Sequence, residues 1–251
     1  MSDIFLKDIC VSFPIYDGAN RSLKYRVLEA GTGGRVKPAS NGRIVISAID
    51  NLSLHIGHGE RVALIGHNGA GKTTLLRVIA GIYIPQTGDV RLSGSVAPLF
   101  DTGFGMDPDA TGYENIRLRS LYLGMTKREV EARLPDIEAF AGLGSFLSMP
   151  LRTYSEGMRA RLAFAVSTSI QPDILLLDEQ IAAGDAAFME RAARRLDELV
   201  ARSGILVLAS HSAEAVIRFC TRGIVMEHGR LMFDGAVQDA LEWYAARRAA
   251  P

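Results

Sequence analysis

The sequence predicts an α/β fold with a parallel core sheet, on three observations. Apolar runs of strand length stand at Arg61–Ile65, Ile174–Leu177 and Ile205–Ala209, and such runs are typical of parallel strands buried on both faces. Segments with helical spacing separate these runs. A mostly helical middle, about Thr111–Ile170, is inserted between the first and second of them. Strands joined by helical crossovers around a helical insertion indicate the α/β class.

The chain's size and composition are those of a folded globular protein. It has 251 residues, of which 48% are hydrophobic and 22% are charged, so disorder is not expected. The charges of its 28 basic and 28 acidic side chains cancel, and this balance gives no indication of nucleic-acid binding. Cys10 and Cys220 lack metal-ligand spacing and are expected to be reduced thiols in a cytoplasmic protein.

The sequence shows neither a signal peptide nor a membrane-spanning helix. The opening MSDIFLKDIC lacks a basic region followed by an apolar run. No apolar run reaches the ~18–20 residues that cross a bilayer. Any membrane role is therefore expected to depend on a partner.

The N-terminal third is expected to contain strands on either side of an irregular region. Ile4–Phe13 alternates apolar and polar residues, which indicates a strand. Arg21–Ala30 has helical spacing, and Gly31–Gly42 is a loop rich in glycine, proline and serine. The next segment, RIVISAIDNLSLHI, alternates over what we expect to be two short strands.

The later elements carry clear start and stop signals. We expect a helix at Thr73–Ala80, stopped by Gly81, and a second helix capped by Thr126 with Glu129 three residues on. The C-terminal part predicts a hairpin and a closing helix, at Ile224–Met226, Leu231–Phe233 and Asp239–Arg248.

A glycine loop, GHNGAGKT, follows the strand Arg61–Ile65 and precedes a helix. It matches the phosphate-binding pattern G-x-x-x-x-G-K-[ST] in full and in the right context, so a chance glycine-rich turn is disfavoured. Its glycines let successive N–H groups point at phosphate oxygens. Lys72 supplies a cation for the β- and γ-phosphates, and the Thr73 hydroxyl can ligate Mg²⁺. The sequence therefore predicts ATP and Mg²⁺ binding. The predicted nucleotide-binding residues of the loop are Gly66, His67, Asn68, Gly69, Ala70, Gly71, Lys72, Thr73 and Thr74.

Three further segments carry candidate site residues. Asp178, at the carboxyl end of a buried strand, can hold Mg²⁺ through its water shell, and Glu179 can polarise a water for attack on the γ-phosphate. Ser155 can cap a helix and, with the amide of Gly157, face an anion. His211 follows another buried strand and can donate a hydrogen bond to a phosphate, although a lone histidine is more often structural.

In this order the motifs resemble the ABC transporter ATPases, over about Ile4–Gly235. GHNGAGKT corresponds to the Walker A loop, ILLLD to the Walker B strand and YSEGM to the signature motif. Ala182–Asp185 corresponds to the D-loop, Glu179 to the catalytic glutamate and His211 to the switch histidine. The resemblance implies that two copies sandwich two ATP molecules, so that each site combines Lys72 of one chain with Ser155 of the other.

The same resemblance implies a domain organisation. It predicts a P-loop NTPase core with a mostly parallel sheet, an antiparallel β subdomain and a helical subdomain insertion. The whole chain, 1–251, is then one domain, with its core at about 1–100 and 171–251. A helix is inserted at about 19–30 and the helical subdomain spans about 103–170.

Some positions depart from the family pattern. The family usually has a glutamine in the loop that joins the core to the helical subdomain. The corresponding segment here is PLFDTGFG, in which Asp101 is the best match to that glutamine. Its carboxylate can still reach Mg²⁺. Glu156 stands where a small residue is usual, so its side chain is expected to point away from the phosphate. No aromatic residue precedes the loop at the usual adenine-stacking position. Arg43 falls near that spot and can stack through its guanidinium, with Tyr16 and Tyr25 as other candidates.

Within this family the chain resembles the exporters of O-antigen and related polysaccharides, through APLFDTGFGMDPDATGYENI and the helix at Arg21–Ala30. The resemblance implies an integral-membrane permease subunit as partner and a location at the cytoplasmic face of the inner membrane. Glu114 is expected where the helical subdomain meets that partner, or else is a solvated helix-start acid. A C-terminal carbohydrate-binding domain is not expected.

Three alternatives remain at this point. The cargo can be a teichoic acid, a lipid or a drug. A soluble ABC protein acting on nucleic acid or ribosomes is disfavoured by the neutral charge and by the presence of a single cassette. A module that binds nucleotide without hydrolysis is disfavoured by Lys72, Asp178, Glu179 and His211.

Overall fold

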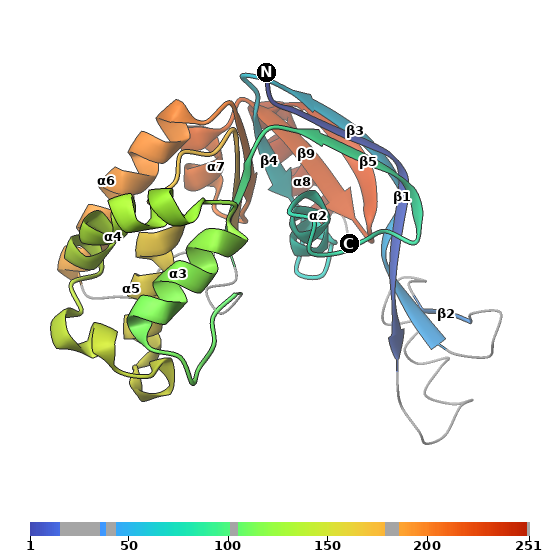
Figure 1. Ribbon diagram of the computed structural model, residues 1–251. Helices are drawn as coiled ribbons and strands as arrows, with labels where there is room; N and C mark the ends of the chain where they lie inside the picture. Colours follow the sequence, from blue (N-terminus) through green and yellow to red (C-terminus); the bar gives the residue numbers. More distant parts are fainter. Residues whose placement is uncertain (16–35, 39–43, 101–104, 179–185, 250–251) are drawn as a thin grey trace. The chain divides into compact units, whose positions relative to one another are not determined.

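The chain divides into two compact units in the computed structural model. The structure describes residues 1–15, 36–38, 44–100, 105–178 and 186–249. Unit 1 comprises residues 1–2 and 94–206, and unit 2 comprises residues 3–93 and 207–251. Helices, parallel strand pairs and antiparallel strand pairs are all present (Figure 1), so the predicted α/β class is confirmed.

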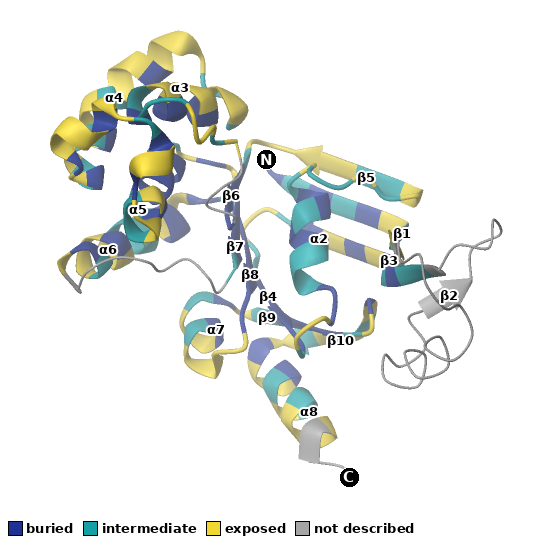
Figure 2. Ribbon diagram, turned by 90° about the horizontal axis from the view of Figure 1, so that it is seen from below, coloured by how far each residue is buried: buried dark blue, intermediate teal, exposed yellow. Residues whose placement is uncertain are grey.

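Unit 2 contains an antiparallel sheet. Its strands, in spatial order, are β2 (Val36–Pro38), β3 (Ile44–Gly57), β1 (Asp3–Ile15) and β5 (Thr87–Ser93). Buried and exposed residues alternate along β1 and β3 (Figure 2), because successive side chains of a strand point to opposite faces. The antiparallel β subdomain that the sequence implied is therefore present.

The prediction of two short strands in 43–56 is wrong, because β3 is one strand of 14 residues. Its register against β1 shifts near the middle, where Asp8 and Asn51 both have a left-handed backbone, with φ of 50° and 51°. The Ser53 hydroxyl donates to Asp8 Oδ1 over 2.9 Å there. A β-bulge interrupts the polar–apolar alternation without ending the ladder, and the interruption resembles a strand boundary in the sequence.

A second set of strands in unit 2 positions the glycine loop. β4 (Arg61–Ile65) pairs in parallel with β9 (Arg222–Glu227), and β9 forms a hairpin with β10 (Arg230–Ala236). Val62, Ala63, Leu64 and Ile65 are all at most 2% exposed, as expected for a strand with both faces covered. The described residues of unit 2 form the helices α2 (Lys72–Ile79), α7 (Ala213–Phe219) and α8 (Val237–Ala249).

Unit 1 combines parallel strands with a helical layer. β6 (Val96–Leu99) pairs in parallel with β7 (Ile174–Asp178), and the boundary between the units falls within β8 (Ile205–Ala209). Figure 1 shows α3, α4 and α5 packed side by side, around a core that includes Ile116, Ile137 and Leu162. In its described ranges unit 1 has the helices α3 (Gly112–Tyr122), α4 (Lys127–Ala141), α5 (Glu156–Ser167) and α6 (Ala186–Arg202), with short 3₁₀ turns at Gly144–Ser148 and Leu151–Thr153.

Capping boxes begin two of these helices. At α4 the Thr126 hydroxyl accepts from the Glu129 N–H over 3.3 Å, and the Glu129 carboxylate accepts from the Thr126 N–H over 2.7 Å. This box is confirmed. Thr111 and Glu114 form the same reciprocal pair at α3, over 3.2 and 2.7 Å. The signal for this second box is the T-x-x-E pattern of TGYE in the sequence.

Several expected elements lie outside the described residues, among them the helix at Arg21–Ala30 and most of the loop Gly31–Gly42. In the ranges that are described, no helix combines the length and the apolar character needed to cross a membrane.

Candidate functional site

The glycine loop of unit 2 joins the end of β4 to the start of α2. Gly66 and Gly71 are buried, whereas Asn68 and Gly69 at the tip are exposed. α2 begins at Lys72 with Gly71 as its N-cap, and no side chain caps the helix. The first amides of α2 therefore lie at the positive end of a helix whose N-cap residue is a glycine. Such an arrangement is typical of a phosphate site.

Close backbone packing fixes the shape of this loop. A β-carbon on Gly66 would lie 2.4 Å from the Met226 carbonyl oxygen, and one on Gly71 would lie 2.7 Å from the Ala48 carbonyl oxygen. Gly71 also has a φ of 109°, which disfavours other residues. These glycines are therefore required by contacts with neighbouring strands as well as by the turn itself.

The turn between β9 and β10 supports the loop from one side. The Gly229 N–H donates to the Ala70 carbonyl oxygen over 2.9 Å, and the His228 ring lies 5.2 Å from the ring of His67. The sequence predicts the hairpin that contains this turn but assigns the turn no role in the site. The contact joins residues that are far apart in the sequence, so no local sequence pattern predicts it.

Lys72 lies over the loop from which it extends. Its Nζ donates to the carbonyl oxygens of Gly66, over 2.5 Å, and His67, over 3.2 Å. The ammonium group is therefore held at the concave side of the loop by backbone acceptors that a phosphate oxygen can replace. Thr73 and Thr74 follow in the first turn of α2 and are half-buried.

Two predicted site segments belong to unit 1. Asp178 ends β7 and is half-buried, after four residues of at most 1% exposure. Ser155 is the N-cap of α5, and its hydroxyl accepts from the Met158 N–H over 3.2 Å. The predicted cap is confirmed. Gly157 is half-buried in the first turn, and Glu156 is exposed to solvent.

His211 lies in unit 2 directly after β8 and is exposed. It precedes Ser212, whose hydroxyl caps α7 by accepting from the Ala215 N–H over 3.3 Å. The histidine is thus at the carboxyl end of a strand whose five residues are all buried. Ligands of α/β sheets bind at such strand ends.

The remaining candidates are Glu179, Arg43, Asp101, Tyr16, Tyr25 and the segment Ala182–Asp185, and all lie outside the described residues. Glu114 is described, and its carboxylate is engaged in the α3 cap. Hydrogen bonds from the N–H and hydroxyl of Thr111 lower the pKa of Glu114. Glu114 is therefore a helix-start acid, which is one of the two roles expected from the sequence.

Cys220, one of the two cysteines, is buried, and burial raises the pKa of its thiol to about 12. A thiol with such a pKa remains protonated at neutral pH and is a poor nucleophile. The expectation of an unreactive, reduced cysteine is consistent with this environment.

The loop residues fit a nucleotide's phosphates. They provide a backbone that admits no β-carbon at Gly66 or Gly71, an exposed tip, and a lysine ammonium held by two carbonyl oxygens of the loop. Mg²⁺ would be held by oxygen ligands, and the Thr73 hydroxyl and the Asp178 carboxylate have the required chemistry.

Comparison with known proteins points the same way. A family model described as ABC transporter matches residues 49–182. The chain is 44% identical over 229 residues to the O-antigen export system ATP-binding protein RfbE of Yersinia enterocolitica, covering 91% of this chain and 96% of that protein. It is 40% identical to the O-antigen export system ATP-binding protein RfbB of Myxococcus xanthus, covering 88% of this chain and half (50%) of that protein. The teichoic acids export ATP-binding protein TagH of Bacillus cereus is 38% identical, with coverages of 79% and 36%.

Solved structures share the fold. The ATP-binding subunit of an ABC transporter superposes with a TM-score of 0.68 at 22% identity, covering 98% of this chain and 95% of that one. A dimeric post-hydrolysis state of the ATP-binding cassette MJ0796, bound to ADP and Pi, gives a TM-score of 0.66 at 21% identity, with coverages of 93% and 98%.

The support of the loop by the β9–β10 turn can be tested with Gly229→Ala. Gly229 has a φ of +79°, and a β-carbon there would lie 2.6 Å from the Ala48 carbonyl oxygen. We expect the turn to shift and to displace the loop through Ala70, so that ATP binding weakens at least about tenfold, as measured by calorimetry. This corresponds to about 1.4 kcal/mol.

The matched control is Gly59→Ala. Gly59 has a similar φ of +90°, but a β-carbon there meets nothing within 4 Å. It imposes the same backbone strain without the clash and should leave ATP affinity unchanged. Equal losses in the two variants would show that the turn does not support the loop.

Proposed function

This chain belongs to the ABC transporter family, as one of its ATPases, and from that membership we propose that it powers export of lipid-linked O-antigen or a similar polysaccharide across the inner membrane. A separate membrane subunit would form the pathway. The observation that carries the proposal is the similarity to the Yersinia enterocolitica export protein, which extends over 91% of this chain and 96% of that one.

The proposed ATP site begins with the phosphate loop. Its amides and the start of α2 bind the phosphates, and Lys72 leaves the carbonyl oxygens of Gly66 and His67 to contact them. Mg²⁺, held by Thr73, Asp178 and Asp101, would neutralise charge on the phosphates. Glu179 takes a proton from the attacking water, and His211 donates a hydrogen bond to the γ-phosphate.

A second copy of the chain would complete each site. The exposed Ser155 at the N-terminus of α5 presents a hydroxyl whose hydrogen is available for donation, beside the amide of Gly157. A helix start of this kind favours an anion. We propose that it contacts the nucleotide held by the partner's loop, and that the exposed Glu156 points to solvent. Closure of the two copies on ATP and reopening after hydrolysis would drive the membrane subunits.

An apolar patch on unit 1 is the proposed contact with the membrane subunit. On α3, Leu118 is 46% exposed, Leu121 is 43% exposed and Tyr122 is 53% exposed. The 3₁₀ turn Gly144–Ser148 packs on α3, and Phe146 in this turn and Met149 directly after it are 44% and 47% exposed. Positions i, i+3 and i+4 of a helix share one face. Exposed large apolar side chains gathered on one face are typical of a protein contact. Because the chain belongs to the ABC transporter family, we propose that a cytoplasmic segment of the permease covers this patch.

Teichoic acid is the second candidate cargo, because the export proteins TagH of Bacillus cereus and Bacillus anthracis are 38% and 36% identical to this chain. The gene neighbourhood discriminates between the two. Genes for O-antigen glycosyltransferases beside a permease gene would favour O-antigen, whereas genes for polyol-phosphate polymerases would favour teichoic acid.

Glu179→Gln tests the proposed hydrolysis chemistry. The amide cannot accept a proton, so we expect the rate of ATP hydrolysis to fall at least about 100-fold, while ATP still binds in a filter assay. Glu242→Gln on α8, an exposed position, removes the same charge and should keep the wild-type rate. Hydrolysis at the normal rate in Glu179→Gln would show that the base is another group.

Leu121→Glu tests the proposed permease contact. A carboxylate in the apolar patch must lose water on docking, so we expect co-purification of the co-expressed permease to fall by about tenfold or more. ATP binding by the isolated chain should not change.

Ile217→Glu is the matched control, since Ile217 is 53% exposed on α7 of unit 2. Retention of the permease by Leu121→Glu, or an equal loss with Ile217→Glu, would place the contact elsewhere.

A further inference from the structure

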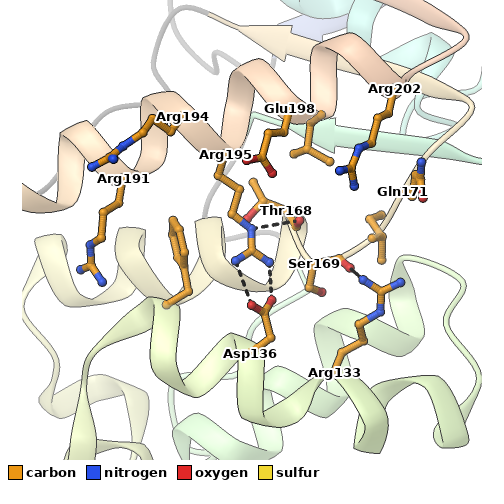
Figure 3. A pocket seen from close by; sticks show the side chains of 13 residues that line it. Arg133, Asp136, Thr168, Ser169, Gln171, Arg191, Arg194, Arg195, Glu198 and Arg202 are labelled. Carbon is orange, nitrogen blue, oxygen red and sulfur yellow. Dashed lines mark hydrogen bonds and ion pairs between the residues drawn. The ribbon is translucent and has the colours of Figure 1, made fainter.

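An arginine-lined pocket lies within unit 1, and none of its lining residues belongs to the phosphate loop. It has a volume of about 460 Å³ and opens between α4, α6 and the segment 168–171 that leaves α5 (Figure 3). Five arginines line it, against two carboxylates, Asp136 and Glu198. The chain as a whole has no net charge, so this concentration of positive charge is local.

Two of the arginines have a structural role. Arg195 forms an ion pair with Asp136, donates to the Thr168 carbonyl oxygen over 3.3 Å and lies 4.5 Å above the ring of Phe140. Arg191 lies over the rings of Phe140 and Phe188 at 5.6 and 5.8 Å. These contacts hold α6 against α4 and α5. A third arginine, Arg194, forms an ion pair with Glu190 along the exposed side of α6.

The other two arginines, Arg133 and Arg202, keep their charge available. Arg133 donates to the Ser169 carbonyl oxygen over 2.6 Å, which orients its guanidinium without neutralising it. Arg202 is exposed at the end of α6. Neither forms an ion pair with any carboxylate in the described ranges of the chain. Figure 3 shows the two side chains pointing toward one another across the pocket, from α4 and α6.

We propose that Arg133 and Arg202 bind a phosphoryl group, in a site separate from the ATP site. Two guanidinium groups match the charge of a phosphate dianion, and each can donate two parallel hydrogen bonds to its oxygens. Gln171, which also lines the pocket, adds an amide donor. The volume is within the range of small-molecule sites, so the pocket has room for the remainder of a phosphorylated ligand. The phosphate comes from a free phosphorylated compound or from a phospholipid headgroup.

Binding of pyrophosphate and of lipid vesicles tests the site. The full-length chain carries Lys72→Ala in every sample, so that the phosphate loop loses its cation and contributes little to the binding. Calorimetry measures pyrophosphate binding, and flotation measures binding to phosphatidylcholine vesicles with and without phosphatidic acid. We expect Arg202→Gln to weaken binding about tenfold, the effect of losing one charged hydrogen-bonding partner, and the pair Arg133→Gln with Arg202→Gln to abolish it.

The matched control is Arg128→Gln with Arg218→Gln, which removes the same charge from positions on α4 and α7 that do not line the pocket. It should change binding by less than about twofold. Loss with the pocket variants alone supports the site, and the probe that binds identifies a free compound or a headgroup as the source. Arg202 is exposed, so its single variant is decisive if the double variant unfolds. Absence of binding to both probes, undiminished binding by Arg202→Gln, or an equal loss in the control would overturn the proposal.

Discussion

The phosphate loop depends on backbone contacts that leave no space for a β-carbon. The Ala48 carbonyl oxygen of β3 faces both Gly71 in the loop and Gly229 in the β9–β10 turn, and the Met226 carbonyl oxygen of β9 faces Gly66. The Gly229 N–H closes the arrangement by donating to Ala70. The loop is therefore fixed by strands that precede and follow it by many residues. The loop backbone is already held in place before any phosphate arrives, which lowers the ordering cost of binding.

The proposed catalytic groups are divided between the two compact units. The phosphate loop and His211 belong to unit 2, whereas Asp178 and the Ser155 helix start belong to unit 1. The proposed apolar contact with the permease also belongs to unit 1. In this proposal, unit 1 carries both the contact with a partner's nucleotide and the contact with the membrane subunit. ATP-dependent closure would then be communicated to the membrane within one rigidly packed set of helices.

Much of the fold could be predicted from the sequence because its signals are local. β4 and β8 have the predicted bounds, since each is a short apolar run between turn residues. The Thr126 box and the Ser155 cap depend on residues three positions apart. The continuity of β3 could not be predicted, because a bulge at Asn51 conceals it.

The features that sequence patterns did not predict arise from contacts between distant segments. The support of Ala70 by Gly229 and the pairing of Arg195 with Asp136 bring together elements far apart in the chain. Arg133 and Arg202 carry no motif, because guanidinium groups from different helices become neighbours only after the helices pack. The ATP motif is recognisable for the opposite reason, since its amides, lysine and hydroxyl come from one continuous segment.

In the proposed mechanism each ATP site is shared by two copies of the chain. Measuring ATP turnover per chain over a range of protein concentrations, with the dimer fraction followed by sedimentation in the same buffer, tests this sharing. Sharing predicts that turnover per chain rises with concentration, in parallel with the ATP-dependent dimer, and then levels off. Turnover that is independent of concentration in a protein that remains monomeric would contradict it.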